Sequence, residues 1–239
     1  MSSVFYYPSG RAEEYSEGLA LNIYLGCTNA CDYCYNSKSR FSKPDYFLCA
    51  KPRKDILERV TKDAPEIKGK SVFLSFMSDA YQDEEEKLML TRLILFEFLK
   101  NDIKPIILTK NKLVIRDFDL IKKCGGKVGT TLTHIDKIYS QIEPHSSTPE
   151  ERIEILKLAK EKGIETFVSL EPIIDLHETL DIIDKTHQYT DFYKVGRWNH
   201  DEEANHLDWK NVVKSVVEHL TNLDKKFMVK KELKKYLNE

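Results

Sequence analysis

The chain has 239 residues, with 37 Lys and Arg against 39 Asp and Glu, and a formal net charge of −2. This balance excludes a globally basic nucleic-acid binder, and the 41% hydrophobic and 32% charged residues are typical of a globular protein rather than a disordered one. No apolar run reaches the roughly 20 residues of a membrane span, and the first residues lack the pattern of a secretory signal, so we expect a cytoplasmic protein without membrane contact.

Six short runs of apolar and β-branched residues predict strands. They begin near Leu21, Val72, Pro105, Val128, Glu165 and Asp191. The stretches between them have helical periodicity. Thr148 and Glu151 form the two ends of a predicted capping box, and Gly163 stands where that helix is expected to end.

Strands that alternate with helices predict parallel pairing through right-handed crossovers, and hence an α/β fold. The predicted strands begin about 34 residues apart, so eight such units would need about 270 residues, which the chain does not have. We therefore predict a partial (β/α)6 barrel in residues 1–220, with its core at about 19–200 and a short C-terminal extension at 221–239. A doubly wound sheet is the alternative.

The strongest signal is a group of three cysteines directly after the first predicted strand: Cys27, Cys31 and Cys34. Three thiolates at this spacing can hold one face of a [4Fe–4S] cluster and leave one iron without a protein ligand. A structural zinc site is the alternative of another class, a non-catalytic metal-binding module, and its fourth ligand would be Cys49.

The pattern Cys27, Cys31, Tyr33 and Cys34 resembles the signature of radical S-adenosylmethionine (radical SAM) enzymes. In that superfamily the open iron binds the amino and carboxylate groups of SAM. An electron from the cluster then cleaves SAM to a 5′-deoxyadenosyl radical, which abstracts hydrogen from the substrate. The resemblance implies that Tyr33 lies near the adenine.

Polar residues follow the ends of the other predicted strands, where loops of a parallel βα fold share one rim. The segments that contain these polar residues, taken in chain order, resemble those of the branch that contains spore photoproduct lyase and DNA-repair-photolyase-like proteins. By that resemblance Ser78 and Asp79 replace a motif that binds the methionine amino group, Lys110 pairs with the carboxylate, and Thr131 lies near the ribose. Glu171 and Asn199 are expected as further cofactor or substrate contacts. Helix capping by Ser78 and Asp79 is the structural alternative.

The sequence departs from this branch in one place. Spore photoproduct lyase uses a cysteine just before the Ser-Asp pair to return a hydrogen atom, whereas this chain has Ser75, Phe76 and Met77 there. The sequence therefore assigns no catalytic hydrogen donor, and Cys49 is a weak candidate. Cys124 is expected at the opposite end of the barrel.

The segment after the cysteines is basic and aromatic, which would suit phosphates and stacked bases. Its cations are Lys38, Arg40, Lys43, Lys51, Arg53 and Lys54. The lysines at 225–235 predict one face of an exposed helix. The leading hypothesis is thus a radical SAM enzyme with a nucleic acid or nucleotide as substrate, reduced by a flavodoxin or ferredoxin. A radical SAM enzyme acting on a peptide or small metabolite is the second hypothesis.

Overall fold

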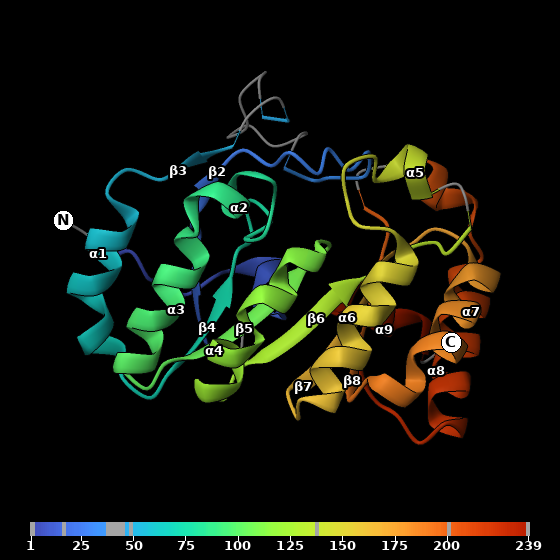
Figure 1. Ribbon diagram of the computed structural model, residues 1–239. Helices are drawn as coiled ribbons and strands as arrows, with labels where there is room; N and C mark the ends of the chain where they lie inside the picture. The colour runs from blue at the N-terminus through green and yellow to red at the C-terminus, as the bar shows by residue number, and fades with distance from the viewer. Residues whose placement is uncertain are drawn as a thin grey trace.

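The structure, a computed structural model, describes residues 3–15, 18–36, 46–47, 50–136, 139–199 and 202–237. A parallel sheet of seven strands organises it, and each strand pairs with the next in the order of the chain (Figure 1). The strands are β1 (Leu19–Leu21), β4 (Ser71–Leu74), β5 (Lys104–Thr109), β6 (Lys127–Thr131), β7 (Glu165–Ile173), β8 (Phe192–Arg197) and β9 (Lys226–Val229). The first six are the six predicted strands, so the α/β partial barrel is confirmed.

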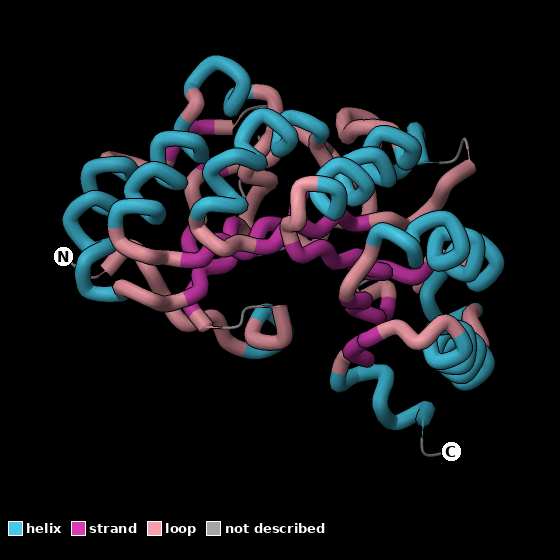
Figure 2. The backbone as a smooth tube through the Cα atoms, turned by 60° about the horizontal axis from the view of Figure 1, so that its bottom comes forward, coloured by secondary structure: helices cyan, strands magenta, loops and turns pink. Residues whose placement is uncertain are grey.

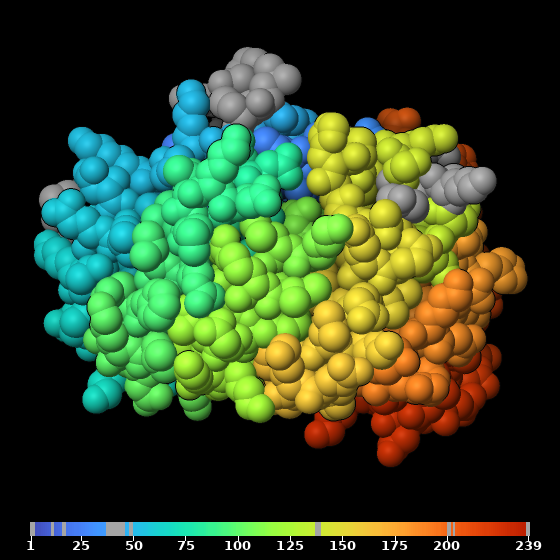
Figure 3. All heavy atoms as spheres, viewed as in Figure 1, coloured from blue at the N-terminus to red at the C-terminus, as the bar shows by residue number. Residues whose placement is uncertain are grey.

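Helices connect these strands and cover the outer side of the sheet, which Figure 2 shows as an arch. They are α1 (Ile56–Asp63), α3 (Leu90–Lys100), α4 (Phe118–Lys123), α6 (Pro149–Glu161), α7 (Leu176–Thr186) and α8 (Trp209–Asn222). The predicted capping box of α6 is present, because the Thr148 hydroxyl accepts from the Glu151 N–H and the Glu151 carboxylate accepts from the Thr148 N–H. Side chains from these helices form the continuous face seen in Figure 3.

Shorter elements lie mainly at the edge where the strands end. β2 (Tyr24–Leu25) pairs antiparallel with β3 (Lys51–Pro52), and α2 (Glu84–Leu88) and α5 (Tyr139–Ile142) lie nearby at the top of Figure 1. The C-terminal helix α9 (Lys231–Lys234) follows β9. Short 3-10 helices occur at Gly10–Ala12, Ala64–Ile67, Lys112–Asp117, His187–Tyr189, Glu203–His206 and Lys235–Leu237.

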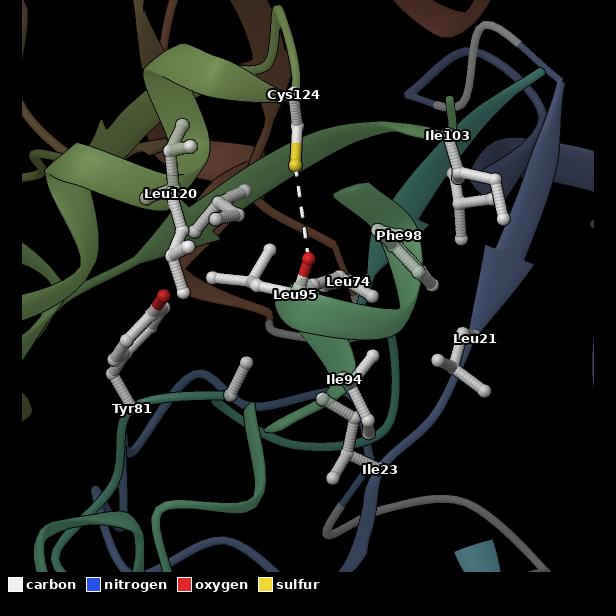
Figure 4. Packing of buried hydrophobic residues seen from close by; sticks show 14 of the residues in the cluster. Leu21, Ile23, Leu74, Tyr81, Ile94, Leu95, Phe98, Ile103, Leu120 and Cys124 are labelled. Atoms are coloured by element: carbon white, nitrogen blue, oxygen red, sulfur yellow. Dashed lines mark hydrogen bonds between the residues drawn. The ribbon is translucent and has the colours of Figure 1, made fainter. Parts of the chain in front are cut away.

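Both faces of the sheet are buried, and successive residues of a strand point to opposite faces. On β4, Val72 and Leu74 pack against the helices, whereas Phe73 belongs to a separate cluster with Tyr15 and Phe167. Figure 4 shows the helix side of this packing, in which Leu74 lies among Leu95 and other apolar side chains. The sheet is therefore fixed from both sides, and its strand ends have a defined position.

The C-terminal extension differs from the prediction of one exposed helical face at 225–235, which is wrong. Residues Lys226–Val229 form β9, parallel to β8, and only Lys231–Lys234 continue as a helix of the α type. The apolar residues Phe227, Met228 and Val229 between the lysines explain this, because they cover the edge of the sheet. In the part of the chain that the structure describes, no helix combines the length and apolar character that a bilayer crossing requires.

Candidate active site

The loops after the strands enclose a cavity of about 480 Å³ at the edge of the sheet that lies at the top of Figure 1. All ten described residues that the sequence singles out for cluster and cofactor line it: Cys27, Cys31, Tyr33, Cys34, Ser78, Asp79, Lys110, Thr131, Glu171 and Asn199. Cys49 lies outside the described residues, so its predicted roles stay predictions. The geometry thus brings together side chains from strand ends and from the loops that follow them.

The cysteine loop follows β2 and is held by backbone hydrogen bonds. The N–H of Cys27 donates to the Tyr46 carbonyl at 3.0 Å, and that of Cys34 donates to the Cys31 carbonyl at 3.1 Å. Burial, reinforced for Cys27 by the nearby Asp79 carboxylate, raises the pKa of the Cys27 thiol to about 12, and burial raises the pKa of Cys31 to about 11. Thiolates at these positions therefore require a cationic partner such as a metal.

Asp79 joins the cysteine loop to the end of β5. Its carboxylate accepts hydrogen bonds from the Asn29 amide at 3.0 Å, the Thr109 hydroxyl at 2.6 Å and the backbone N–H of Lys110 at 2.9 Å. It also accepts from the N–H of Tyr81, two residues on, and does not cap α2, which begins at Glu84. Asp79 thus has a positioning role in this structure, and its contact with a methionine amino group stays a prediction.

Ser78 differs from its neighbour Asp79. Its side chain is buried, and its Oγ atom has no hydrogen-bond partner among the described residues. Leaving a buried hydroxyl without a partner costs free energy, so such an atom at a cavity wall is suited to a bound polar group. The unpartnered Ser78 hydroxyl therefore shows that this side of the cavity fits a polar cofactor.

A second network supports Lys110 and Tyr33. The Tyr33 hydroxyl donates to Glu143, whose carboxylate forms a fully buried ion pair with Arg152. The Lys110 ammonium lies 5.5 Å from the centre of the Tyr33 ring. Burial opposes the charge of Lys110, but Cys31, Glu143 and Asp79 outweigh it and raise the pKa of the ammonium group, which therefore stays protonated.

Arg152 also connects this network to β6, because its guanidinium donates to the Thr131 carbonyl at 2.8 Å. A second arginine near a helix start, Arg116, forms an ion pair with Asp117 at 2.8 Å. Glu143 was missed by sequence reasoning. It lies outside the predicted strands and helices, and no sequence pattern connects it with Tyr33, 110 positions away.

Glu171 lies in a further polar cluster, on β7. Its carboxylate accepts from the Tyr15 hydroxyl and from the Lys230 ammonium, whose nitrogen is 2.8 Å from Oε2. The Tyr15 hydroxyl also lies 2.6 Å from the Ser169 Oγ. Sequence reasoning missed both Tyr15 and Lys230, because they lie 156 and 59 positions from Glu171 and outside the predicted strand ends.

The segment after β8 completes the wall. Asn199 donates to the Arg197 carbonyl, and the Arg197 guanidinium donates to the Asn205 side chain at 3.0 Å. Arg197 also lies over the Trp209 ring, 5.2 Å from its centre. Asn199 is therefore placed at the cavity, as the sequence predicts, with a rigid arginine beside it.

The three thiols suit a cluster, whereas the zinc alternative depends on Cys49, which lies outside the described residues. Among the described residues, no three His, Cys, Asp or Glu side chains converge closely enough to hold one metal ion. The thiols of a cluster bind different iron atoms and need not converge on one point. Three thiols, an ammonium and a strip of hydroxyls in one cavity fit the cluster and the cofactor of a radical SAM enzyme.

Comparison with known families agrees. The model of the Radical SAM superfamily matches residues 21–190, so the chain belongs to this superfamily. The uncharacterized protein MJ0683 of Methanocaldococcus jannaschii is 37% identical over 179 residues, which are 72% of this chain and 67% of that protein. The uncharacterized protein ORF301 of Acidianus two-tailed virus is 32% identical over 199 residues, 74% of this chain and 65% of that protein. This chain thus spans about two thirds of each relative.

Solved structures share the fold. A cysteine-to-serine mutant of spore photoproduct lyase matches with a TM-score of 0.71 and 13% identity, over 90% of this chain and 77% of that one. A mutant of the same enzyme with bound AdoMet and dinucleoside spore photoproduct matches with a TM-score of 0.67 and 14% identity, over 89% and 76%. Streptococcus suis SuiB bound to the precursor peptide SuiA matches with a TM-score of 0.55 and 17% identity, over 88% and 48%. At 13–17% identity these likenesses show a shared fold.

Proposed function

We propose that the protein holds a [4Fe–4S] cluster on Cys27, Cys31 and Cys34 and binds SAM in the adjoining cavity. The observation that carries this proposal is that the three thiols, Lys110 and the unpartnered Ser78 hydroxyl line one cavity at the strand ends. When bound, the cluster supplies the electron that cleaves SAM to a 5′-deoxyadenosyl radical, which takes a hydrogen atom from the substrate.

The chain's own residues have four tasks in this scheme. The Lys110 ammonium attracts the methionine carboxylate, and its raised pKa keeps it charged for that purpose. Tyr33, Thr131, Glu171 and Asn199 form the remaining wall and orient the adenosyl group. Asp79 holds the cysteine loop against the end of β5. The enclosing side chains keep water away from the reacting groups.

The test is anaerobic reconstitution of the chain with iron and sulfide, followed by reduction in the presence of SAM. We expect about four iron and four sulfide per chain and formation of 5′-deoxyadenosine. Replacing any of Cys27, Cys31 and Cys34 by Ala should abolish both. Cys124→Ala is the matched control, because that thiol is buried in the core and does not line the cavity. 5′-Deoxyadenosine formation that persists in the three variants would overturn the assignment.

For the substrate, we propose a nucleic acid or nucleotide. Support comes from the structural likeness to an enzyme solved with a dinucleoside spore photoproduct. The basic segment adds to it: Lys51 and Lys54 are exposed, and Arg53 is half-buried. Tyr35, half-exposed at the cavity wall, offers a ring on which a base can stack. Lys38, Arg40 and Lys43 lie outside the described residues and stay predicted contacts.

The reaction of spore photoproduct lyase itself is not part of this proposal. Where that enzyme has its hydrogen-donating cysteine, just before the Ser-Asp pair, this chain has Ser75, Phe76 and Met77. None of these three side chains carries a thiol that could return a hydrogen atom. We therefore propose a nucleic-acid radical reaction that ends differently.

Replacing Lys51, Arg53 and Lys54 by Gln tests the nucleic-acid substrate. A single-stranded oligonucleotide should bind the triple variant more weakly, and the dependence of affinity on salt should become shallower. The affinities of the unchanged protein for a Glu-rich peptide and for the oligonucleotide can then be compared. If the peptide binds tightly and the oligonucleotide does not, the second candidate, a peptide substrate, is favoured. The structural likeness to peptide-bound SuiB supports that candidate. The electron donor is proposed to be a flavodoxin or ferredoxin.

A further inference from the structure

The two ends of the chain meet at one carboxylate inside the cavity. Tyr15 and Lys230 both lie outside residues 21–190, the part that the family model matches, and both hydrogen-bond to Glu171. Neither residue belongs to a motif of the sequence. The carboxylate is thus held by parts of this chain that its family membership does not explain.

Lys230 is fixed in place before any ligand binds. Its residue is 2% exposed, and its ammonium lies 2.8 Å and 3.1 Å from the two oxygens of Glu171 and 4.1 Å from the centre of the Tyr15 ring. Its backbone N–H donates to the Val195 carbonyl at 3.0 Å, which joins it to β8. The lysine therefore gives the carboxylate a defined position and a compensating charge.

Tyr15 holds the same carboxylate from the N-terminal side. Its hydroxyl contacts Ser169 as well as Glu171, and its carbonyl accepts from the Lys194 ammonium at 2.9 Å. The Lys194 ammonium also lies 4.6 Å from the centre of the Tyr15 ring. The phenol is thus immobilised between β7 and β8.

Gly196 leaves the space that Glu171 needs. A Cβ atom at position 196 would lie 2.5 Å from the Cδ atom of Glu171, closer than such atoms approach. The side chain of Glu171 is therefore confined from three directions, by β8, by the N-terminal segment and by the residue after β9.

A strip of polar groups runs from Glu171 to the neighbouring strand. Ser169 and Glu171 of β7 both contact the Tyr15 hydroxyl, and Thr131 of β6 is the register partner of Ser169. All three line the cavity that contains the cysteines. Two hydroxyls and a carboxylate in a row complement the vicinal hydroxyls of a ribose, which carboxylates bind in other nucleotide sites.

We propose that Tyr15 and Lys230 are positioning residues that hold the Glu171 carboxylate for the ribose hydroxyls of SAM. The N-terminal segment and the C-terminal strand thereby complete the cofactor site. This inference rests on the proposed function, because it requires SAM to bind in this cavity.

Titration calorimetry with two nucleosides tests the inference. Adenosine and 2′,3′-dideoxyadenosine, which lacks both ribose hydroxyls, are titrated into the reconstituted protein. The unchanged chain should bind adenosine about tenfold more tightly, as expected for hydrogen bonds to a charged group. Lys230→Met and Tyr15→Phe should each reduce this preference toward one and leave the affinity for dideoxyadenosine in place. Lys226→Met, which changes an exposed lysine of β9, is the matched control and should keep the preference.

Two results would overturn the proposal: a preference that survives in both variants, or an unchanged chain that binds the two nucleosides equally or not at all. Tyr15→Phe keeps the ring and its packing, so it tests the idea even if Lys230→Met does not fold. Formation of 5′-deoxyadenosine is measured in parallel. A chain that cleaves SAM without the ribose preference refutes this inference alone, whereas a chain without cluster or cleavage refutes the proposed function.

Discussion

At the scale of single residues, paired buried charges support the residues that line the cavity. Glu143 and Arg152 are both fully buried and satisfy one another, and Tyr33 completes the set. Removing one partner of such a pair leaves an uncompensated charge, which costs far more than loss of a surface pair. The position of Tyr33 therefore depends on an ion pair that is remote from it in sequence.

Arg152→Met should lower the free energy of unfolding by about 3–5 kcal/mol, because the Glu143 carboxylate stays buried without its partner. Lys160→Met is the control, since the Lys160–Asp191 pair is partly exposed and should contribute about 1 kcal/mol or less. Urea unfolding of the two variants and the unchanged chain measures both. If the two variants lose the same unfolding free energy, the buried pair does not contribute more than the partly exposed pair, and the prediction is wrong.

Single residues of the site differ in whether the sequence could predict them. The cysteines, Lys110 and Thr131 are found because they follow predicted strands, and the parallel topology brings strand ends to one rim. Tyr15, Glu143 and Lys230 were missed because their partners are fixed by tertiary packing alone. Lys230 in particular stands in a lysine-rich run that resembles a solvated surface, yet it is 2% exposed.

At the scale of elements, helices and strands with clear local sequence patterns were predicted, and those without such patterns were missed. The capping box at Thr148 and Glu151 fixes the start of α6. β9 was missed because it has only four residues and lies between lysines, so the helical spacing of the charges outweighed its apolar residues. Its pairing with β8 comes from the sheet edge, which is a property of the folded chain.

Glu151→Gln tests the start of α6 through its pH dependence. Hydrogen bonds from Lys112 and from the Thr148 backbone lower the pKa of the Glu151 carboxyl below its ordinary 4.5. A lowered pKa stabilises the fold above pH 4.5, and this stabilisation is lost as the pH falls through the folded-state value. The variant should therefore be less stable than the unchanged chain at pH 7, and the difference should shrink as the pH falls well below 4.5.

Urea unfolding at several pH values measures this difference. Glu154→Gln is the control on the same helix, because the Glu154 carboxylate forms only an exposed pair with Lys157, at 3.8 Å. A difference for Glu151→Gln that does not depend on pH would contradict the explanation.

Gly129→Ala tests the packing of β6 against β7. A Cβ atom at position 129 would lie 2.4 Å to 2.5 Å from carbon atoms of the Phe167 ring. Overpacking of this kind should cost about 1–3 kcal/mol of unfolding free energy. Adding Phe167→Leu should recover part of the loss, as thermal or urea unfolding will show. A double variant less stable than both single variants would argue against a direct clash.

At the scale of the whole molecule, the sheet is an open arch (Figure 2). Helices close its outer side, and the cavity lies at the strand ends. The N-terminal segment crosses to β7 through Tyr15, and β9 extends the other edge. The general form was predictable from the six-unit rhythm, whereas the joining of the two ends at Glu171 was not.

The most direct test of the central claim is electron paramagnetic resonance of the reduced, anaerobically reconstituted chain with and without SAM. A cluster on Cys27, Cys31 and Cys34 leaves one iron open to SAM, so we predict a [4Fe–4S] signal that changes when SAM is added. Cys124→Ala should behave as the unchanged chain does. A signal that SAM does not alter, or a metal centre ligated entirely by protein, would contradict the claim.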